Sequence, residues 1–203
     1  MHIEPGIVTG AKLALSAVTA AGAGLYTAKL AWNELKERNV ASLAARTVAS
    51  TALVFCFFQV LPHYPVGVSE VHLILGSTLF LILGAAPAAF GLALGLLLQG
   101  LFFAPFDLLQ YGMNVTTLLV PLFGLQYLAK KIIAPNTAYV DLQYSQALAL
   151  STAYQGGVVV FRVSDRIFAV ADAPGAVDLF NNGQDVKGLL NQLSFRNKPA
   201  LMG

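Results

Sequence analysis

The chain has 203 residues and a net charge of +2, with 57% hydrophobic residues and only 11% charged ones. An average soluble protein carries roughly 25% charged residues, because water must solvate most of its surface. The small net charge, without a basic patch interleaved with aromatic residues, also argues against a nucleic-acid partner. The composition therefore excludes an ordinary water-soluble domain and a nucleic-acid-binding protein.

The shortage of charge is strongest between Thr47 and Ala129, where Glu70 and Asp107 are the only formally charged residues. Such a stretch cannot form a water-facing surface, so lipid is the expected solvent. We predict an all-α fold, a polytopic membrane helix bundle with about six transmembrane segments. The single cysteine, Cys56, lies in an apolar run, so no internal disulfide can form and a small buried side chain is expected.

The first predicted segment covers about residues 7–32 and is rich in Ala and Gly. In lipid, small residues at spacings of four let two helix backbones approach closely, so we expect this segment to pack against its neighbours. No basic region precedes it, as a signal peptide would require, so Met1 is expected to be retained. A polar stretch at residues 33–38 then leads to a second segment at about residues 40–61.

Residues 71–106 carry no formal charge. As one helix they would extend about 54 Å, well beyond a hydrocarbon core of about 30 Å, so the chain must turn within them. The turn is predicted at Gly-Ala-Ala-Pro, residues 84–87, because Gly can end a helix and Pro is favoured in the first turn of the next. Segments three and four then cover about residues 72–83 and 88–104. The short third segment and residues 62–69 before it predict a buried re-entrant loop between segments two and three.

Segment five is predicted at about residues 113–128 and is closed by Lys130 and Lys131. Segment six, at about residues 139–161, is amphipathic because it contains Asp and several Gln. From Arg162 onwards the composition becomes polar. We therefore divide the chain into a transmembrane bundle, residues 1–161, and a polar C-terminal tail of unknown fold, residues 162–203.

Basic residues near the segment ends predict the orientation, because Lys and Arg are enriched on the cytoplasmic side of membrane proteins. The connections after segments one and five are basic, whereas those after segments two and four contain no Lys or Arg. The basic residues concerned are Lys29, Lys36, Arg38, Arg46, Lys130 and Lys131. We therefore predict a multi-pass protein with its N-terminus outside.

Three histidines, His2, His63 and His72, are all predicted at the outer face. A histidine directly after a free terminal amine can offer three nitrogens to one ion: the α-amino nitrogen of Met1, the backbone nitrogen of His2 and Nδ1 of its ring. A neutral imidazole from His72 or His63 would complete a square-planar set of four. That geometry indicates Ni(II) or Cu(II), and Co(II) if further ligands or another spin state are allowed.

Each of these residues also has a structural interpretation. His2 could belong to a disordered terminus, His63 to an interfacial loop, and His72 to the start of a helix. Glu70, next to Ser69, could orient a ring nitrogen of His72 or lie in the headgroup region.

Two polar residues interrupt apolar segments. Gln99 and Asn114 could support the metal site, or they could simply form hydrogen bonds between neighbouring helices.

Three motifs together are similar to a known family. These are the opening Met1-His2-Ile3 followed by Pro-Gly, the stretch Gly-Val-Ser-Glu-Val-His-Leu at residues 67–73, and Gly-Met-Asn at residues 112–114. Over about residues 1–157 the chain resembles the substrate-binding (S) component of cobalt and nickel energy-coupling-factor transporters, the CbiM/NikM group. The resemblance implies that Met1, His2 and His72 hold Co(II) or Ni(II) as the transported substrate. The possible supporting residues are His63, Glu70, Ser69, Asn114 and Gln99.

The resemblance also implies a multi-subunit machine in the bacterial cytoplasmic (inner) membrane. A membrane coupling (T) subunit and two ATPase subunits of the ABC type would drive transport, in a context of cobalamin biosynthesis or of nickel enzymes. The sequence contains no Gly-x-x-x-x-Gly-Lys-[Ser/Thr] phosphate loop, so we expect a transporter subunit and not an enzyme. The alternatives are a metal-dependent intramembrane enzyme with Glu70 as base beside His72-bound metal, and a purely structural membrane subunit.

The C-terminal end departs from the family pattern. Members of the group usually continue with more hydrophobic helix after the region that corresponds to Gln155-Gly156-Gly157, and here the chain turns polar. We therefore expect an atypical end, as a truncated or frame-altered chain would have.

Overall fold

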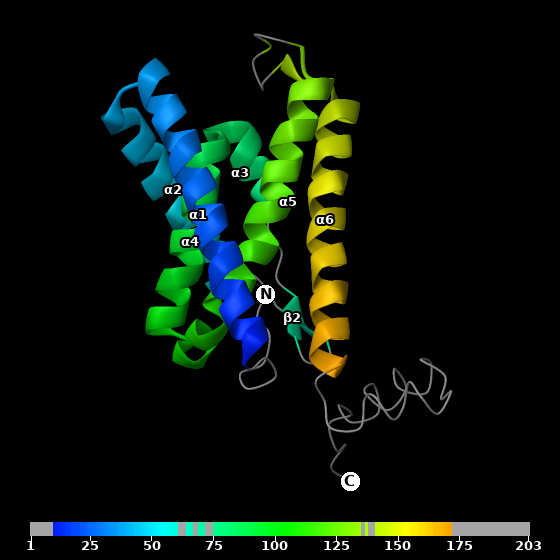
Figure 1. Ribbon diagram of the computed structural model, residues 1–203. Coiled ribbons are helices and arrows are strands. Elements are labelled where there is room, and N and C mark those ends of the chain that lie inside the picture. Colours follow the sequence, from blue (N-terminus) through cyan, green and yellow to red (C-terminus); the bar gives the residue numbers. More distant parts are fainter. Residues whose placement is uncertain are drawn as a thin grey trace.

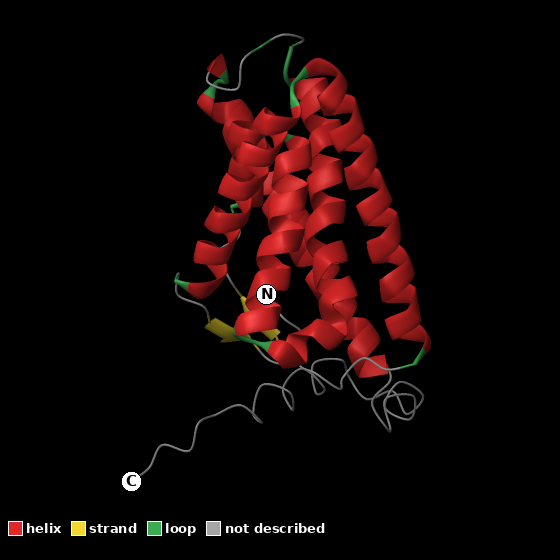
Figure 2. Ribbon diagram, turned by 90° about the vertical axis from the view of Figure 1, so that its left-hand side faces the viewer, coloured by secondary structure: helices red, strands yellow, loops and turns green. Residues whose placement is uncertain are grey.

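The computed structural model describes residues 10–60, 64–66, 69–71, 75–134, 137 and 141–171; for residues 64–66, 69–71 and 162–171 it describes the backbone alone. The helices run side by side as a bundle (Figures 1 and 2). They are α1 (Ala11–Glu37), α2 (Val40–Gln59), α3 (Gly76–Leu83), α4 (Ala85–Phe102), α5 (Tyr111–Ile132) and α6 (Tyr144–Ala171). A 3₁₀ helix, η1 (Pro105–Gln110), precedes α5, and two short strands, β1 (Tyr64–Val66) and β2 (Ser69–Val71), lie between α2 and α3. The predicted all-α membrane bundle is confirmed.

Among the described residues, four helical stretches are long and apolar enough to cross a membrane: α1, α2, α4, and η1 together with α5. Within the described part of the chain, the third predicted segment is helical over the eight residues of α3, which span about 12 Å, less than half of a hydrocarbon core. The predicted number of six crossings therefore remains a prediction.

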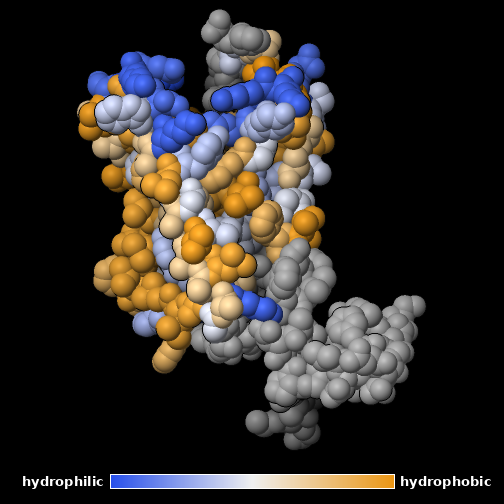
Figure 3. Space-filling model, viewed as in Figure 1, coloured by the Kyte–Doolittle hydropathy of each residue, from blue (hydrophilic) through white to orange (hydrophobic). Residues whose placement is uncertain are grey.

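α4 lies at the centre of the bundle. It packs along α2 on one side and contacts α1, α3 and α5 on others, while α6 packs on α5. Fully buried leucines of α4, α5 and α6 form the core, namely Leu92, Leu118, Leu119, Leu122 and Leu150. Many large apolar side chains remain exposed, and Figure 3 shows hydrophobic residues over much of one face below a hydrophilic upper end. In a membrane this surface faces acyl chains and not water.

The predicted turn between segments three and four is confirmed. α3 ends at Leu83 and α4 begins at Ala85, with Pro87 in the first turn of α4. Gly84 joins them with φ 96 and ψ 169, a conformation that a side chain would make costly.

Several predicted boundaries are shifted. α1 continues through the polar stretch to Glu37, and the side chain of Asn39 then caps α2 by accepting a hydrogen bond from the backbone N of Ser42 at 2.8 Å. An apolar run indicates which part of a helix lies in lipid. Because polar residues can continue the same helix beyond the lipid, the end of the apolar run does not mark the end of the helix. Similarly, α6 continues to Ala171, so the proposed division at residues 161 and 162 falls inside a helix. That division remains a prediction.

The prediction for Cys56 is wrong, because this cysteine is exposed on α2. An apolar sequence context does not distinguish a lipid-facing side chain from a core one.

β1 and β2 form an antiparallel hairpin in the predicted re-entrant loop, with Tyr64 opposite Val71 and Val66 opposite Ser69. The predicted burial of this loop concerns side chains outside those that the structure describes, and it stays a prediction. The hairpin lies at the same end of the bundle as the beginning of α1 and η1 (Figures 1 and 2). The basic connection between α1 and α2 and the Lys130-Lys131 end of α5 lie together at the other end, as the charge pattern predicts.

Candidate metal centre

The predicted metal ligands Met1, His2 and His72, and the alternative His63, lie outside the described residues. Ser69 and Glu70 are described by their backbone only, within β2. Among the residues that the structure describes, no group of three or more His, Cys, Asp or Glu side chains could hold a metal ion. The metal centre therefore stays a prediction.

The chain segments that lead to the predicted ligands meet at one end of the bundle. α1 begins at Ala11 and β2 ends at Val71, directly before His72. Both points lie at the end where η1 connects α4 to α5 (Figure 1). The fold thus brings the start of α1 and the hairpin to the same end of the bundle.

A close contact between α1 and α5 fixes this end. A β-carbon on Gly112 would lie 2.9 Å from the backbone oxygen of Ser16, so only glycine permits this approach. One turn further in, the hydroxyl oxygens of Thr19 and Thr116 are 3.2 Å apart and form a hydrogen bond. The first turns of α1 are therefore held on the first turns of α5.

Gln99 of α4 and Asn114 of α5 are buried near this end, with 6% and 1% of their surface exposed. Neither side-chain polar atom of Asn114 has a hydrogen-bond partner among the described residues, nor does Oε1 of Gln99. For Asn114, the interpretation that it simply links neighbouring helices therefore finds no support among the described residues. An unsatisfied buried amide costs about 1–3 kcal/mol, so these two side chains are available to a further group.

The backbone around Asn114 is firmly placed. Asn114 borders a small gap together with Asp107, Leu108 and Tyr111. The hydroxyl of Tyr111 donates a hydrogen bond of 2.8 Å to the carbonyl of Ala93, which ties the start of α5 to α4.

Two further buried polar residues escaped the sequence analysis. Gln110 ends η1 with 1% of its surface exposed. Tyr154 of α6 is fully buried, and its hydroxyl has no partner among the described residues. A β-carbon on Gly76 would overlap the Tyr154 ring and hydroxyl, so this phenol lies against the first residue of α3. A tyrosine in an amphipathic segment with several glutamines gives no signal of such a position.

Comparison with known proteins identifies the family. A family model described as the cobalt uptake substrate-specific transmembrane region, CbiM, matches residues 2–177. The match extends beyond the motif resemblance at about residues 1–157, and it includes all of α6. Comparisons with curated proteins and with solved structures returned no match. With its helical bundle and its apolar spans, the chain belongs to the CbiM family of cobalt uptake transmembrane components.

Proposed function

We propose that the chain is the substrate-capture subunit of an energy-coupling-factor transporter and that it binds Co(II), or the chemically similar Ni(II), at its outer face. Family membership supports cobalt uptake. The observation that carries the assignment of the site is the shared position of the α1 start and the β1–β2 hairpin at one end of the bundle.

The proposed ligands are the terminal amine of Met1, the backbone nitrogen and ring Nδ1 of His2, and the imidazole of His72. Nine residues lie between Met1 and Ala11, the first residue of α1. Extended chain advances about 3.3 Å per residue, which is long enough to fold back over the end of the bundle. Four nitrogen donors suit Ni(II) and Co(II) better than Mg(II) or Ca(II).

Asn114 and Gln99 support this site in the proposal. Their amide groups are buried at the same end and have oxygen or nitrogen atoms without described partners. Such groups can hold the backbone of a folded-back terminus in place, as outer hydrogen bonds hold metal ligands elsewhere.

We further propose that a membrane coupling subunit and two ATPase subunits complete the transporter in the bacterial inner membrane, with the N-terminus of this chain outside. On α1, a β-carbon added to Gly22 or Gly24 would meet nothing within 4 Å among the described residues, so no described part of the chain covers this small-residue face. We assign it to contact with the coupling subunit, because small residues allow helices of two proteins to approach in lipid.

Isothermal titration of the purified protein with Co(II) and Ni(II) tests the chelate. We expect about one metal ion per chain, in line with four nitrogens for one ion. His2→Ala, His72→Ala and a one-residue extension before Met1 should each abolish binding, since each removes or displaces a nitrogen ligand. His63→Ala serves as the matched control and should bind as the wild type does. Normal binding by the extended form would exclude the terminal chelate.

The same titration separates the other two functions. A structural subunit would bind neither metal at micromolar concentration. An intramembrane enzyme with Glu70 as base would keep water on its metal, which X-ray absorption would show as a mixed oxygen and nitrogen set.

A further inference from the structure

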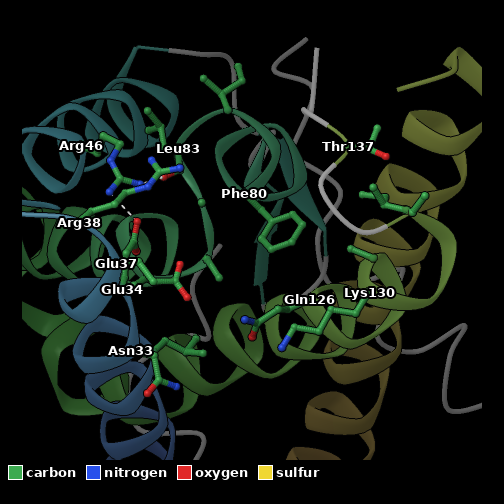
Figure 4. Close-up of a pocket in the computed structure, with 18 residues that line it drawn as sticks. Asn33, Glu34, Glu37, Arg38, Arg46, Phe80, Leu83, Gln126, Lys130 and Thr137 are labelled. Carbon is green, nitrogen blue, oxygen red and sulfur yellow. Dashed lines mark hydrogen bonds and ion pairs between the residues drawn. The ribbon is translucent and has the colours of Figure 1, made fainter. Parts of the chain in front are cut away.

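A polar cavity of about 690 Å³ lies at the end of the bundle that carries the basic connections, opposite to the predicted metal centre. Its walls come from the C-terminal turns of α1 and α5, from α2, and from the turn between α3 and α4 (Figure 4). Figure 3 shows the hydrophilic side chains of this end around a hollow, with hydrophobic residues on the face below it. We therefore expect the cavity at the depth where lipid headgroups meet acyl chains.

The described lining of this cavity has an excess of positive charge. Its three cations are Arg38, Arg46 and Lys130, and its two carboxylates are Glu34 and Glu37, which leaves a net charge of +1. Nη2 of Arg46 and Oε1 of Glu34 are 2.5 Å apart and form an ion pair. These two side chains are only 18% and 17% exposed, so they neutralise each other within the protein.

Arg38 and Lys130 are the cations that remain for a ligand. Both are exposed, and neither has an ion-pair partner among the described residues. Arg38 follows the end of α1 and Lys130 belongs to the last turn of α5, so they approach the cavity from different walls (Figure 4). Against them stands the carboxylate of Glu37. Two cations on facing walls suit an anion with several oxygen atoms, and a guanidinium fits phosphate especially well.

Gln126 of α5 adds a polar group to the same cavity. Its Oε1 is buried and has no hydrogen-bond partner in the part of the chain that the structure describes. A buried amide oxygen without a partner costs about 1–3 kcal/mol, so a hydroxyl group that donates to it is favourable. The site therefore offers two cations for a phosphate and an acceptor for a hydroxyl.

The walls change from polar to apolar toward the middle of the bundle. On α1, Tyr26 and Leu30 precede Glu34 by two turns and one turn on the same face, and on α5 Phe123 precedes Lys130 by two turns. The rings of Tyr26 and Phe123 pack edge to face, with their centroids 4.6 Å apart. Tyr26 is still 38% exposed. A polar end above an apolar surface fits an amphiphile better than a free ion.

We propose that this cavity binds the headgroup of an anionic phospholipid. The phosphodiester contacts Arg38 and Lys130, and a hydroxyl of the headgroup donates to Gln126. The acyl chains lie against the aromatic pair of Tyr26 and Phe123. A phosphatidylglycerol headgroup has one negative charge, which balances the +1 of the lining, and it carries hydroxyl groups. Basic pockets between transmembrane helices hold anionic headgroups in the same way. The inference goes beyond the proposed function and does not depend on the metal centre.

Lipid titration of the purified full-length protein tests this site. In detergent micelles the protein is titrated with phosphatidylglycerol or with phosphatidylcholine of the same acyl chains, and native mass spectrometry counts the bound lipids. We expect one tightly bound phosphatidylglycerol per chain and about tenfold weaker binding of phosphatidylcholine, which has no net charge to balance the cations. Equal affinities would overturn the proposal. Absence of bound phosphatidylglycerol would also overturn it, in favour of an acidic segment of a partner protein.

Substitutions in the cavity distinguish a specific site from general attraction to a basic surface. Arg38→Gln and Lys130→Gln should each weaken phosphatidylglycerol binding about fivefold, as the loss of one basic contact does. Lys36→Gln and Lys131→Gln are the matched controls, because they remove the same charge at the same end without lining the cavity. Nζ of Lys131 lies instead 4.5 Å from the centroid of the Tyr127 ring. A similar loss in the controls would overturn the proposal.

Glu37→Gln gives an outcome that misfolding cannot imitate. It raises the net charge of the described lining from +1 to +2 and should tighten phosphatidylglycerol binding about fivefold. Unchanged or weaker binding would contradict the proposed position of the phosphate.

Inorganic phosphate distinguishes a lipid site from a site for a free anion. At millimolar concentration it should not displace phosphatidylglycerol, because it has no acyl chains to bury. Displacement would assign the cavity to free phosphate and would overturn the lipid proposal. None of these outcomes involves Co(II) or Ni(II), so they are separate from a failure of the proposed function.

Discussion

Gln99 and Asn114 can be identified from sequence because each interrupts an apolar segment, and the structure buries both. The opposite case is Tyr154, whose burial depends on contact between α6 and the start of α3, two segments far apart in the chain. A polar residue in an apolar run is thus a local signal, whereas the position of a phenol in an amphipathic helix follows only from tertiary packing. The ligands Met1, His2 and His72 come from a motif, and they remain predictions.

The unpartnered amide of Asn114 gives a prediction at this scale. Asn114→Leu removes a buried polar group of similar volume, so the folded state should be equally stable or more stable by about 1–3 kcal/mol. Affinity for Co(II) should nevertheless fall, because the proposed support of the folded-back terminus is lost. Thermal unfolding and titration measure the two effects.

Ser50→Ala is the control for this substitution. Ser50 is also fully buried, and its hydroxyl oxygen has no hydrogen-bond partner among the described residues, but it lies on α2 against Gly91 of α4. It should leave Co(II) affinity unchanged. Unaltered affinity in Asn114→Leu would remove Asn114 from the proposed site.

For the helices, the sequence predicts a boundary well where it depends on a few neighbouring residues. It does not predict which face of a helix contacts another helix. The joint at Gly84 is predicted because Gly and Pro act locally. The small residues of the first segment predict its packing, and α1 does contact α5 and α4, but Gly22 and Gly24 do not make the contact, because an added β-carbon there would meet nothing within 4 Å among the described residues. The closest approach is instead between α2 and α4, where Gly91 and Gly95 lie one turn apart against Ser50 and Val54. The sequence shows where glycines occur, but which of them contacts another helix depends on the tertiary structure.

Gly91→Ala therefore tests the contact between α2 and α4. A β-carbon at this position would lie 2.8 Å from the backbone carbon of Ser50, so a backbone has to move. We expect a loss of about 1–3 kcal/mol of stability, the usual cost of overpacking. Gly124→Ala in α5, where the added carbon meets nothing within 4 Å, should be neutral or stabilising by up to about 1 kcal/mol, because alanine favours helix. Thermal unfolding in detergent compares the two, and equal melting temperatures would contradict the close approach.

For the whole molecule, the distribution of charge predicts which ends lie together. The basic connections after α1 and α5 share one end with the polar cavity, and the start of α1 shares the other with the hairpin. This arrangement follows from the number of membrane crossings and from the cost of moving Lys and Arg through lipid. The apolar segments and the basic residues can both be counted in the sequence. The cavity itself could not be predicted, because its walls combine residues of α1, α2, α3, α4 and α5.

The extent of the functional molecule toward the C-terminus gives the last prediction. α6 belongs to the core, because Leu150, Tyr154 and Val158 are at most 1% exposed, and a β-carbon on Gly157 would lie 3.1 Å from the side chain of Pro121 on α5. The family match continues to residue 177. Deletion of residues 178–203 should therefore leave Co(II) affinity within about twofold of the wild type, because it removes none of the described core residues and none of the proposed ligands.

Deletion from Gln155 onwards is the matched comparison. It removes Val158 and the contact of Gly157 with Pro121, and a lost core side chain alone costs about 2–5 kcal/mol. This shorter chain should lose both thermal stability and Co(II) binding, as unfolding and titration would show. If instead the loss of residues 178–203 abolished binding in a protein that still unfolds at the wild-type temperature, the tail would have to contribute to the metal centre.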